Sequence, residues 1–189
     1  MTQADARVPV RRYGEGVTGD GEDQVAIEAP LEIRLRVAGH AARSISITLR
    51  TPGQDEELAL GFLLGEGLIR GPADVLDVHT GDADGEQGSV VEVALAEGLA
   101  PDLDRLTRHF YATSSCGVCG RASLDALKAL GHPPIDAGSF RIDSAWLPVL
   151  PETLAGRQSG FTATGGLHAT ASFDANGHID RVREDIGRH

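Results

Sequence analysis

Both cysteines of the chain, Cys116 and Cys119, lie in the run Ser115-Cys-Gly-Val-Cys-Gly120. Two thiols at this spacing can carry sulfur or take part in redox exchange, and both uses need a thiolate. The next residues are apolar at helical intervals up to Leu130, and Gly131 ends the pattern, so we predict a loop that leads into a helix. Unpaired N–H groups at a helix start favour an anion, and the pKa of a thiol there is expected below the usual value of about 8.5.

Four uses of this cysteine pair are open: reactive thiols, half of a zinc site, a structural disulfide, or two inert buried cysteines. A four-ligand zinc site needs a second pair of ligands at similar spacing, and the nearby His109 and His132 stand singly. A disulfide is typical of small secreted domains, whereas residues 1–9 are polar and lack a signal-peptide pattern. Inert cysteines have no need of flanking glycines. The sequence therefore favours reactive thiols and predicts no bound metal.

Two other clusters of residues could take part in chemistry. In Thr164-Gly-Gly-Leu-His-Ala-Thr170, the glycines Gly165 and Gly166 precede His168. Glycines let the backbone approach a ligand closely, and a histidine can move a proton near neutral pH or bind an anion when charged. The second cluster, Arg183-Glu-Asp-Ile-Gly-Arg-His189, ends in two basic residues beside a glycine, which would suit a phosphate. A structural histidine and an internally paired surface network are the simpler alternatives.

Charge and composition exclude several classes of partner. Lys and Arg number 17 against 28 Asp and Glu, and the resulting formal charge of −11 argues against binding to nucleic acid or to an anionic membrane. No apolar run approaches the roughly 20 residues of a membrane-spanning helix. Two cysteines without an export signal indicate a reducing compartment, so we expect a cytoplasmic protein.

Apolar periodicity divides the chain into three parts. Residues 1–29 are rich in glycine and acidic side chains and predict a mobile tail, with at most a short strand near 25–27. Residues 30–107 predict a small β-rich subdomain with one helix. Residues 108–189 alternate strands and helices, which predicts an α/β domain with a mixed sheet.

Each part can be resolved into individual elements. The subdomain is expected to hold strands at 31–37, 45–49, 75–78 and 90–95. Its helix is predicted to begin with Thr51 as N-cap and Pro52 as first residue, and to stop at Gly65 and Gly67. Elements expected in residues 108–189 are a strand at 109–112, the helix ending at Leu130, a short helix from about Pro151 toward Arg157, a strand at 161–164, and a hairpin of 167–173 and 178–183.

Four motifs stand in a fixed order along the chain. They are Thr51-Pro-Gly with Glu57-Leu-Ala-Leu-Gly-Phe-Leu-Leu-Gly-Glu-Gly67, then Ser115-Cys-Gly-Val-Cys-Gly120, then Phe161 with Thr164-Gly-Gly-Leu-His168, then Arg183-Glu-Asp-Ile-Gly-Arg-His189. From about Leu31 to its end, the chain resembles the FdhD family, the formate dehydrogenase accessory sulfurtransferases. The resemblance implies a cytidine deaminase-like fold. It also implies that sulfur is taken as a persulfide from a cysteine desulfurase. The sulfur would pass to the molybdenum (or tungsten) bis-guanine-dinucleotide cofactor before that cofactor enters formate dehydrogenase.

The resemblance also implies roles for single residues. Cys116, which leads its motif, is expected to carry the persulfide, with Cys119 assisting or resolving it. The cofactor is acted on rather than tightly bound, and a cytoplasmic homodimer is expected. The residues expected to contact the cofactor are Gly165, Gly166, His168 and Arg188.

The sequence departs from the family at its end and leaves two other functions open. Family members continue past the Gly-Arg-His motif into a helix and more of the cofactor-binding region, so we expect the chain ending at His189 to be truncated, less stable and aggregation-prone. A zinc-dependent deaminase-like hydrolase would need His-x-Glu followed by Pro-Cys-x-x-Cys. Here Ser115 replaces that proline, and His168 follows the cysteines without the Glu. A non-catalytic chaperone that holds the cofactor is the other alternative.

Overall fold

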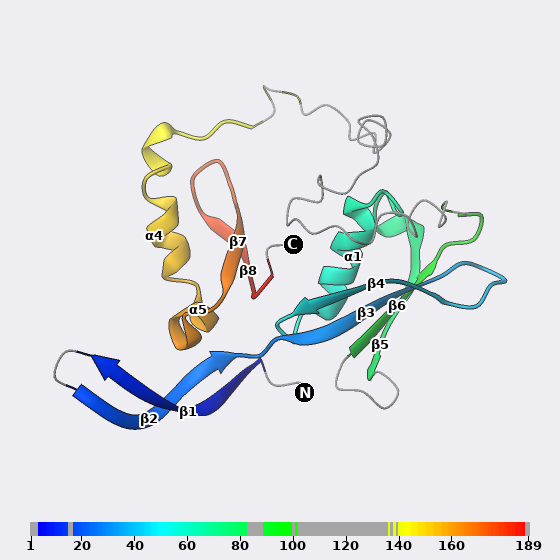
Figure 1. Ribbon diagram of the computed structural model, residues 1–189. Helices are drawn as coiled ribbons and strands as arrows, with labels where there is room; N and C mark the ends of the chain where they lie inside the picture. Colours follow the sequence, from blue (N-terminus) through cyan, green and yellow to red (C-terminus); the bar gives the residue numbers. More distant parts are fainter. Residues whose placement is uncertain are drawn as a thin grey trace, which may run out of the picture. The chain divides into compact units, whose positions relative to one another are not determined.

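The structure is a computed structural model that describes residues 4–14, 17–82, 89–99, 101, 136, 138 and 140–187. They belong to two compact units, one made of Met1–Glu28 with Pro133–Arg188 and the other of Ala29–His132. Both units mix strands with helices, in agreement with the predicted α/β class (Figure 1). The mixed sheet predicted for residues 108–189 is not found in the described part of that stretch, where residues 168–185 form an antiparallel pair of strands. None of the helices in the described ranges combines the length and the apolar character that crossing a membrane requires.

A four-stranded sheet in the order β4-β3-β6-β5 forms the base of the second unit. The strands are β3 (Ala29–Arg36), β4 (Arg43–Arg50), β5 (Val75–Asp82) and β6 (Ser89–Leu95). The central strands β3 and β6 are parallel, and the two outer pairs are antiparallel. All four strands predicted for this subdomain are confirmed. Apolar and polar residues alternate along β3 and β4, whereas β6 is a nearly continuous apolar run because it is buried on both faces.

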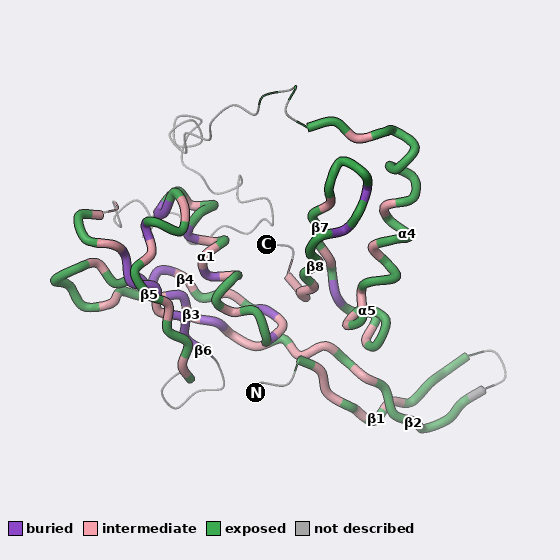
Figure 2. Tube along the Cα trace, turned by 180° about the vertical axis from the view of Figure 1, so that it is seen from behind, coloured by how far each residue is buried: buried purple, intermediate pink, exposed green. Residues whose placement is uncertain are grey.

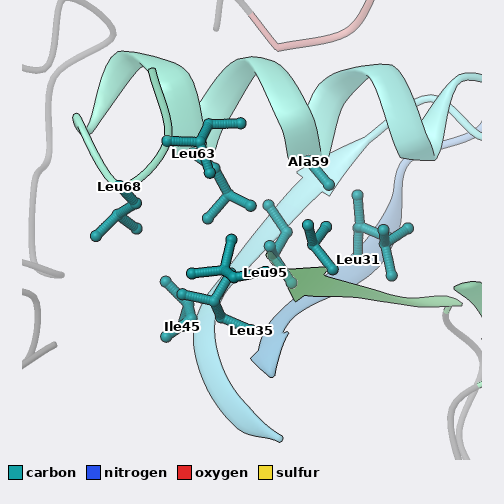
Figure 3. Packing of buried hydrophobic residues seen from close by; sticks show 11 residues of the cluster. Leu31, Leu35, Ile45, Ala59, Leu63, Leu68 and Leu95 are labelled. Carbon is teal, nitrogen blue, oxygen red and sulfur yellow. The ribbon is translucent and has the colours of Figure 1, made fainter. Parts of the chain in front are cut away.

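Helix α1 (Asp55–Gly65) lies across one face of this sheet. Figure 3 shows Ala59 and Leu63 reaching from the helix toward the sheet residues Leu31 and Leu95. All four side chains are at most 1% exposed, and burial of each leucine contributes about 1.5–3 kcal/mol. The same packing gathers the buried residues of the unit along β3, β6 and α1 (Figure 2).

The sequence predicts the end of α1 correctly but not its start. The predicted end is confirmed, because Gly67 takes a positive φ of 71° and the N–H of Leu68 donates to the carbonyl of Leu63. The predicted start is wrong. Thr51 and Pro52 do not open the helix, which begins at Asp55 after Gln54.

A buried arginine explains the later start. The guanidinium of Arg50, 1% exposed, donates to both carboxylate oxygens of Asp55 at 2.9 and 2.6 Å. It also donates to the carbonyl of Ala29 at 3.0 Å and to the hydroxyl of Ser89 at 2.9 Å. Arg50 therefore joins the end of β4 to the first residues of β3, β6 and α1.

A second ion pair fixes the turn that follows α1. Asp74 ends the short 3-10 helix Pro72–Asp74, and its carboxylate accepts from the Arg70 guanidinium at 2.8 and 2.9 Å and from the Arg70 backbone N–H at 2.8 Å. The side-chain hydrogen bonds from Arg70, followed by the backbone one, lower the pKa of Asp74 to about 2.

This pair predicts a loss of stability in acid. Because the folded pKa of about 2 lies below the ordinary value of 3.8, the stabilisation is complete above about pH 4 and disappears as the pH falls toward 2. The variant Asp74→Asn should be less stable at neutral pH and should lose part of the slope between pH 4 and 2. Urea unfolding followed by circular dichroism at several pH values measures both effects. An unchanged slope in Asp74→Asn would contradict the assignment, whereas Arg70→Ala should lose the same part of the slope.

The N-terminal residues correct the prediction of a mobile tail over residues 1–29. Strands β1 (Asp5–Gly14) and β2 (Val17–Ala26) form a continuous antiparallel hairpin. Alternate residues Ala6, Val8 and Val10 are half-buried, and helix α5 (Ser159–Thr164) packs against β2. The glycines and acids of β2 give no strand signal by themselves, so it is pairing and packing that hold this strand.

The C-terminal part of the same unit carries the remaining elements. They are the 3-10 helix η2 (Ser144–Trp146), α4 (Leu150–Ala155), α5, β7 (His168–Phe173) and β8 (Ile179–Asp185). The short helix near Pro151 and the final hairpin are confirmed. The strand predicted at 161–164 is wrong, because these residues belong to α5. The strand predicted at 109–112 and the helix ending at Leu130 lie outside the described residues.

Candidate functional site

The hairpin β7–β8 has one polar face that carries residues of two sequence motifs. His168 is opposite Asp185 in the strand register, and Thr170 is opposite Arg183. His168, Thr170 and Arg183 are exposed, and Asp185 is half-buried. The Gly-Gly-Leu-His motif and the Arg-Glu-Asp motif, separated in sequence, thus present an imidazole, a hydroxyl, a guanidinium and a carboxylate on one surface.

The other face of this hairpin is apolar apart from Glu184 and packs within its own unit. The ring of Phe140 meets that of Phe173 edge-on at 6.3 Å between centroids, and Ile179 is buried. Arg157, just after α4, donates to the carbonyl of Ile179 at 3.3 Å. Ala169, Ala171, Phe173 and Val182 on this face are half-buried, so the described residues cover it only in part.

The turn before His168 is open around its two glycines. Gly165 ends α5 with a φ of 68°, which glycine adopts readily, and its N–H donates to the carbonyl of Phe161 at 2.7 Å. A Cβ on Gly165 would meet no described atom within 4 Å, and one on Gly166 would meet only the Thr164 carbonyl oxygen at 4.0 Å. Among the described residues, neither packing nor a positive φ therefore requires glycine at position 166, and the turn leaves room for a ligand to approach the backbone.

Glu184 joins the two motifs and was missed by the sequence analysis. Its carboxylate accepts from the N–H of Gly160 at 2.9 Å and from that of Phe161 at 2.7 Å, at the start of α5. A Cβ on Gly160 would lie 2.6 Å from Leu167 and 3.2 Å from Glu184. Since the sequence predicts a strand where α5 forms, no local signal points to these hydrogen bonds.

The structure brings together some of the predicted site residues and leaves the others undescribed. Gly165, Gly166 and His168 follow one another at the open turn. Cys116, Cys119 and Arg188 lie outside the described residues. Within the described part of the chain, no group of three or more His, Cys, Asp and Glu side chains is arranged to hold a metal ion.

A shallow hollow of about 160 Å³ lies on the sheet of the other unit. The described residues that line it do not form a group of side chains that could hold a metal ion. Arg34, His79 and Glu92 contribute to its lining. The charged groups on this face pair with one another, since Arg34 donates to Glu32 and Arg36 donates to Glu92, both at 2.6 Å. The β7–β8 hairpin with its glycine turn is therefore the better candidate site.

Comparison with known proteins identifies relatives of the chain. Residues 26–189 match the model of the FdhD/NarQ family. The chain is similar to "Sulfur carrier protein FdhD" of Mycolicibacterium paratuberculosis, with 46% identity over 88% of this chain and 61% of that protein. It is also similar to the protein of that name from Streptomyces coelicolor, with 40% identity over 100% of this chain and 67% of that one.

A solved structure has the same fold. It is the crystal structure of a candidate formate dehydrogenase accessory protein from Desulfotalea psychrophila. The TM-score is 0.62 and the identity 17%, over 98% of this chain and 65% of that one. The chain thus spans about two thirds of the length of these relatives. With its family match from residue 26 onward and identities of 40% and more to two members, the chain belongs to the FdhD/NarQ family.

Proposed function

We propose that the chain is a sulfurtransferase that carries sulfur as a persulfide on Cys116. In this proposal a cysteine desulfurase supplies the sulfur, the molybdenum (or tungsten) bis-guanine-dinucleotide cofactor receives it, and formate dehydrogenase is the enzyme served. The observation that carries the proposal is the family match over residues 26–189, which includes the cysteine pair. Relatives named sulfur carrier proteins support it further.

Loading of Cys116 is an exchange of sulfur between thiolates. The Cys116 thiolate attacks the terminal sulfur of the donor persulfide, a new S–S bond forms, and the donor cysteine leaves as its thiolate. No net oxidation occurs in this step. A thiolate is the reactive form, and the loop before a helix that the sequence predicts around Cys116 would favour it.

Release of the sulfur is a reduction in which Cys119 has a defined part. Its thiolate attacks Sγ of the Cys116 persulfide, the S–S bond of the persulfide breaks, and sulfide leaves toward the acceptor. The two thiols lose two electrons as they form a disulfide, and the transferred sulfur gains these two electrons. A dithiol reductant then restores both thiols for the next cycle.

The acceptor side of the proposal involves Gly165, Gly166, His168 and Arg188. The acceptor carries phosphates, and phosphates are bound by histidine and arginine side chains, while glycines let a ligand approach the backbone closely. The open glycine turn and the polar face around His168 support this role. The proposal also includes a cytidine deaminase-like arrangement of residues 108–189, a homodimer and a cytoplasmic location. The family resemblance supports these three parts.

Mass spectrometry after incubation with a cysteine desulfurase and cysteine tests the proposed function. We expect the chain to gain the mass of one sulfur atom, reversibly by dithiothreitol, because Cys116 accepts the persulfide. Cys116→Ala should abolish the gain, whereas Cys119→Ala should load and fail to release sulfide. The rate of Cys116 alkylation, plotted against pH, should show an inflection below about pH 8. Equal loading of Cys116→Ala, or one zinc ion per purified chain, would overturn the sulfur-carrier function.

A further inference from the structure

We propose that Glu184 is the residue that positions the acceptor-binding turn, by fixing helix α5 and thereby Gly165 to His168. The inference rests on the proposed function, since it concerns the acceptor side of the same site. Glu184 lies on β8 one residue before Asp185, in register with Ala169 next to His168. Its two carboxylate oxygens receive the N–H groups of Gly160 and Phe161 at 2.9 and 2.7 Å.

Helix α5 depends on this carboxylate because it has little support of its own. It is six residues long, and no side chain of its own caps its start, where Gln158 is the N-cap. Helices of this length are not stable in isolation, and two N–H groups at a helix start favour a negative charge. Glutamine could accept one of the two hydrogen bonds with its oxygen, but its NH₂ group would face the second N–H.

Two further hydrogen bonds connect the residues that Glu184 binds to the glycine turn at the end of α5. The carbonyl of Gly160 accepts from the Thr164 hydroxyl at 2.8 Å, and the carbonyl of Phe161 accepts from the Gly165 N–H at 2.7 Å. Both residues that bind Glu184 through their N–H groups thus hold the end of the helix through their carbonyls.

The far side of the turn is fixed by packing against the same residues. Leu167 is 8% exposed, and a Cβ on Gly160 would lie only 2.6 Å from it. His168 then enters β7, which pairs with the strand of Glu184. The turn is therefore held on one side by α5 and on the other by β8, and Glu184 connects these two supports. A turn held in its binding conformation loses less entropy when a ligand binds.

Amide hydrogen exchange in the 189-residue chain tests the positioning role without using activity. In Glu184→Gln we expect the Gly165 N–H, which does not touch Glu184, to exchange about tenfold faster, because its helix has lost an anchor. The Thr153 N–H, bonded to the Val149 carbonyl at 3.0 Å in the region of α4, should keep its rate. Glu152→Gln, which removes the same charge from an exposed position in α4, is the matched control and should change neither rate.

Binding of guanosine diphosphate, a probe for the guanine dinucleotide, gives the functional readout. We expect Glu184→Gln to weaken binding about tenfold and Glu152→Gln to leave it unchanged. If Glu184 acts through the turn, its effect should shrink when His168→Ala is also present, because the two substitutions then remove the same contact. A role in global stability alone would give no such coupling in the folded protein.

The outcomes separate this inference from the proposed function. An unchanged Gly165 exchange rate in Glu184→Gln, or fully additive effects of Glu184→Gln and His168→Ala, would overturn the positioning role and leave the sulfur-carrier function intact. Failure of the unaltered chain to accept sulfur at Cys116 would overturn the proposed function. Failure of the unaltered chain to bind guanosine diphosphate would overturn the acceptor site and this inference with it.

Discussion

Replacement of Arg50 by alanine is expected to lower the free energy of unfolding of the sheet unit by about 3–5 kcal/mol. The substitution leaves the carboxylate of Asp55, 11% exposed in its side chain, without its partner. It also removes the donor to the hydroxyl of Ser89 and to the carbonyl of Ala29. The large effect follows from leaving a buried charge and two polar groups unpaired.

Hydrogen exchange of the β3 and β6 amides measures this loss, because it reports on the sheet unit alone. Arg36→Ala is the matched control: Arg36 also pairs with a carboxylate at 2.6 Å, but its side chain is 45% exposed. In Arg36→Ala the free energy of unfolding should fall by no more than about 1 kcal/mol. Equal effects of the two substitutions would show that burial of Arg50 does not decide the stability of this unit. Removal of both Arg50 and Asp55 should cost less than removal of Arg50 alone.

Gly177→Ala is expected to destabilise the other unit by about 2–5 kcal/mol. Gly177 has a φ of 78°, and a side chain in that conformation costs about 1–2 kcal/mol. Its Cβ would also lie 2.6 to 3.0 Å from three atoms of the Trp146 ring, and such overpacking costs about 1–3 kcal/mol. Trp146 is the single tryptophan of the chain, so its fluorescence follows the unfolding of this region directly.

Gly165→Ala separates the two parts of the Gly177 effect. Gly165 has a similar φ of 68°, but a Cβ there would meet no described atom within 4 Å. Its loss should therefore be only the conformational cost of about 1–2 kcal/mol. If the two alanine variants unfold at the same urea concentration, the Trp146 ring does not resist the added methyl group.

The sequence predicts the elements whose own residues determine them. Leu31, Ile33 and Leu35 alternate with charged residues and mark β3 without any tertiary information. The β7–β8 hairpin follows from the Asp174 turn, where the Asp174 carboxylate accepts from the N–H groups of Asn176 and His178. Such local signals survive folding unchanged because packing reinforces them.

Elements that depend on contacts with distant residues are not predicted from the sequence. Strand β2 has few apolar residues and packs against β1 and α5, and N–H groups in the first turn of α5 donate to the distant Glu184. The candidate site divides in the same way. His168 and its two glycines stand out by residue type, whereas Glu184 gains its role only when β8 lies beside α5. Tertiary hydrogen bonds override the strand preference of Phe161 and its neighbours.

The division of one unit between the two ends of the chain sets an order for folding during synthesis. The unit of Ala29–His132 is contiguous, so it can fold once its residues have left the ribosome. Hairpin β1–β2 is made earlier, but α5, which packs against β2, is made more than 130 residues later. A two-stranded hairpin is marginally stable alone. We therefore expect β1 and β2 to reach their final structure later than the sheet unit that follows them in the sequence. A nascent chain stopped before α5 should show protease-sensitive β1 and β2 strands and a resistant sheet unit.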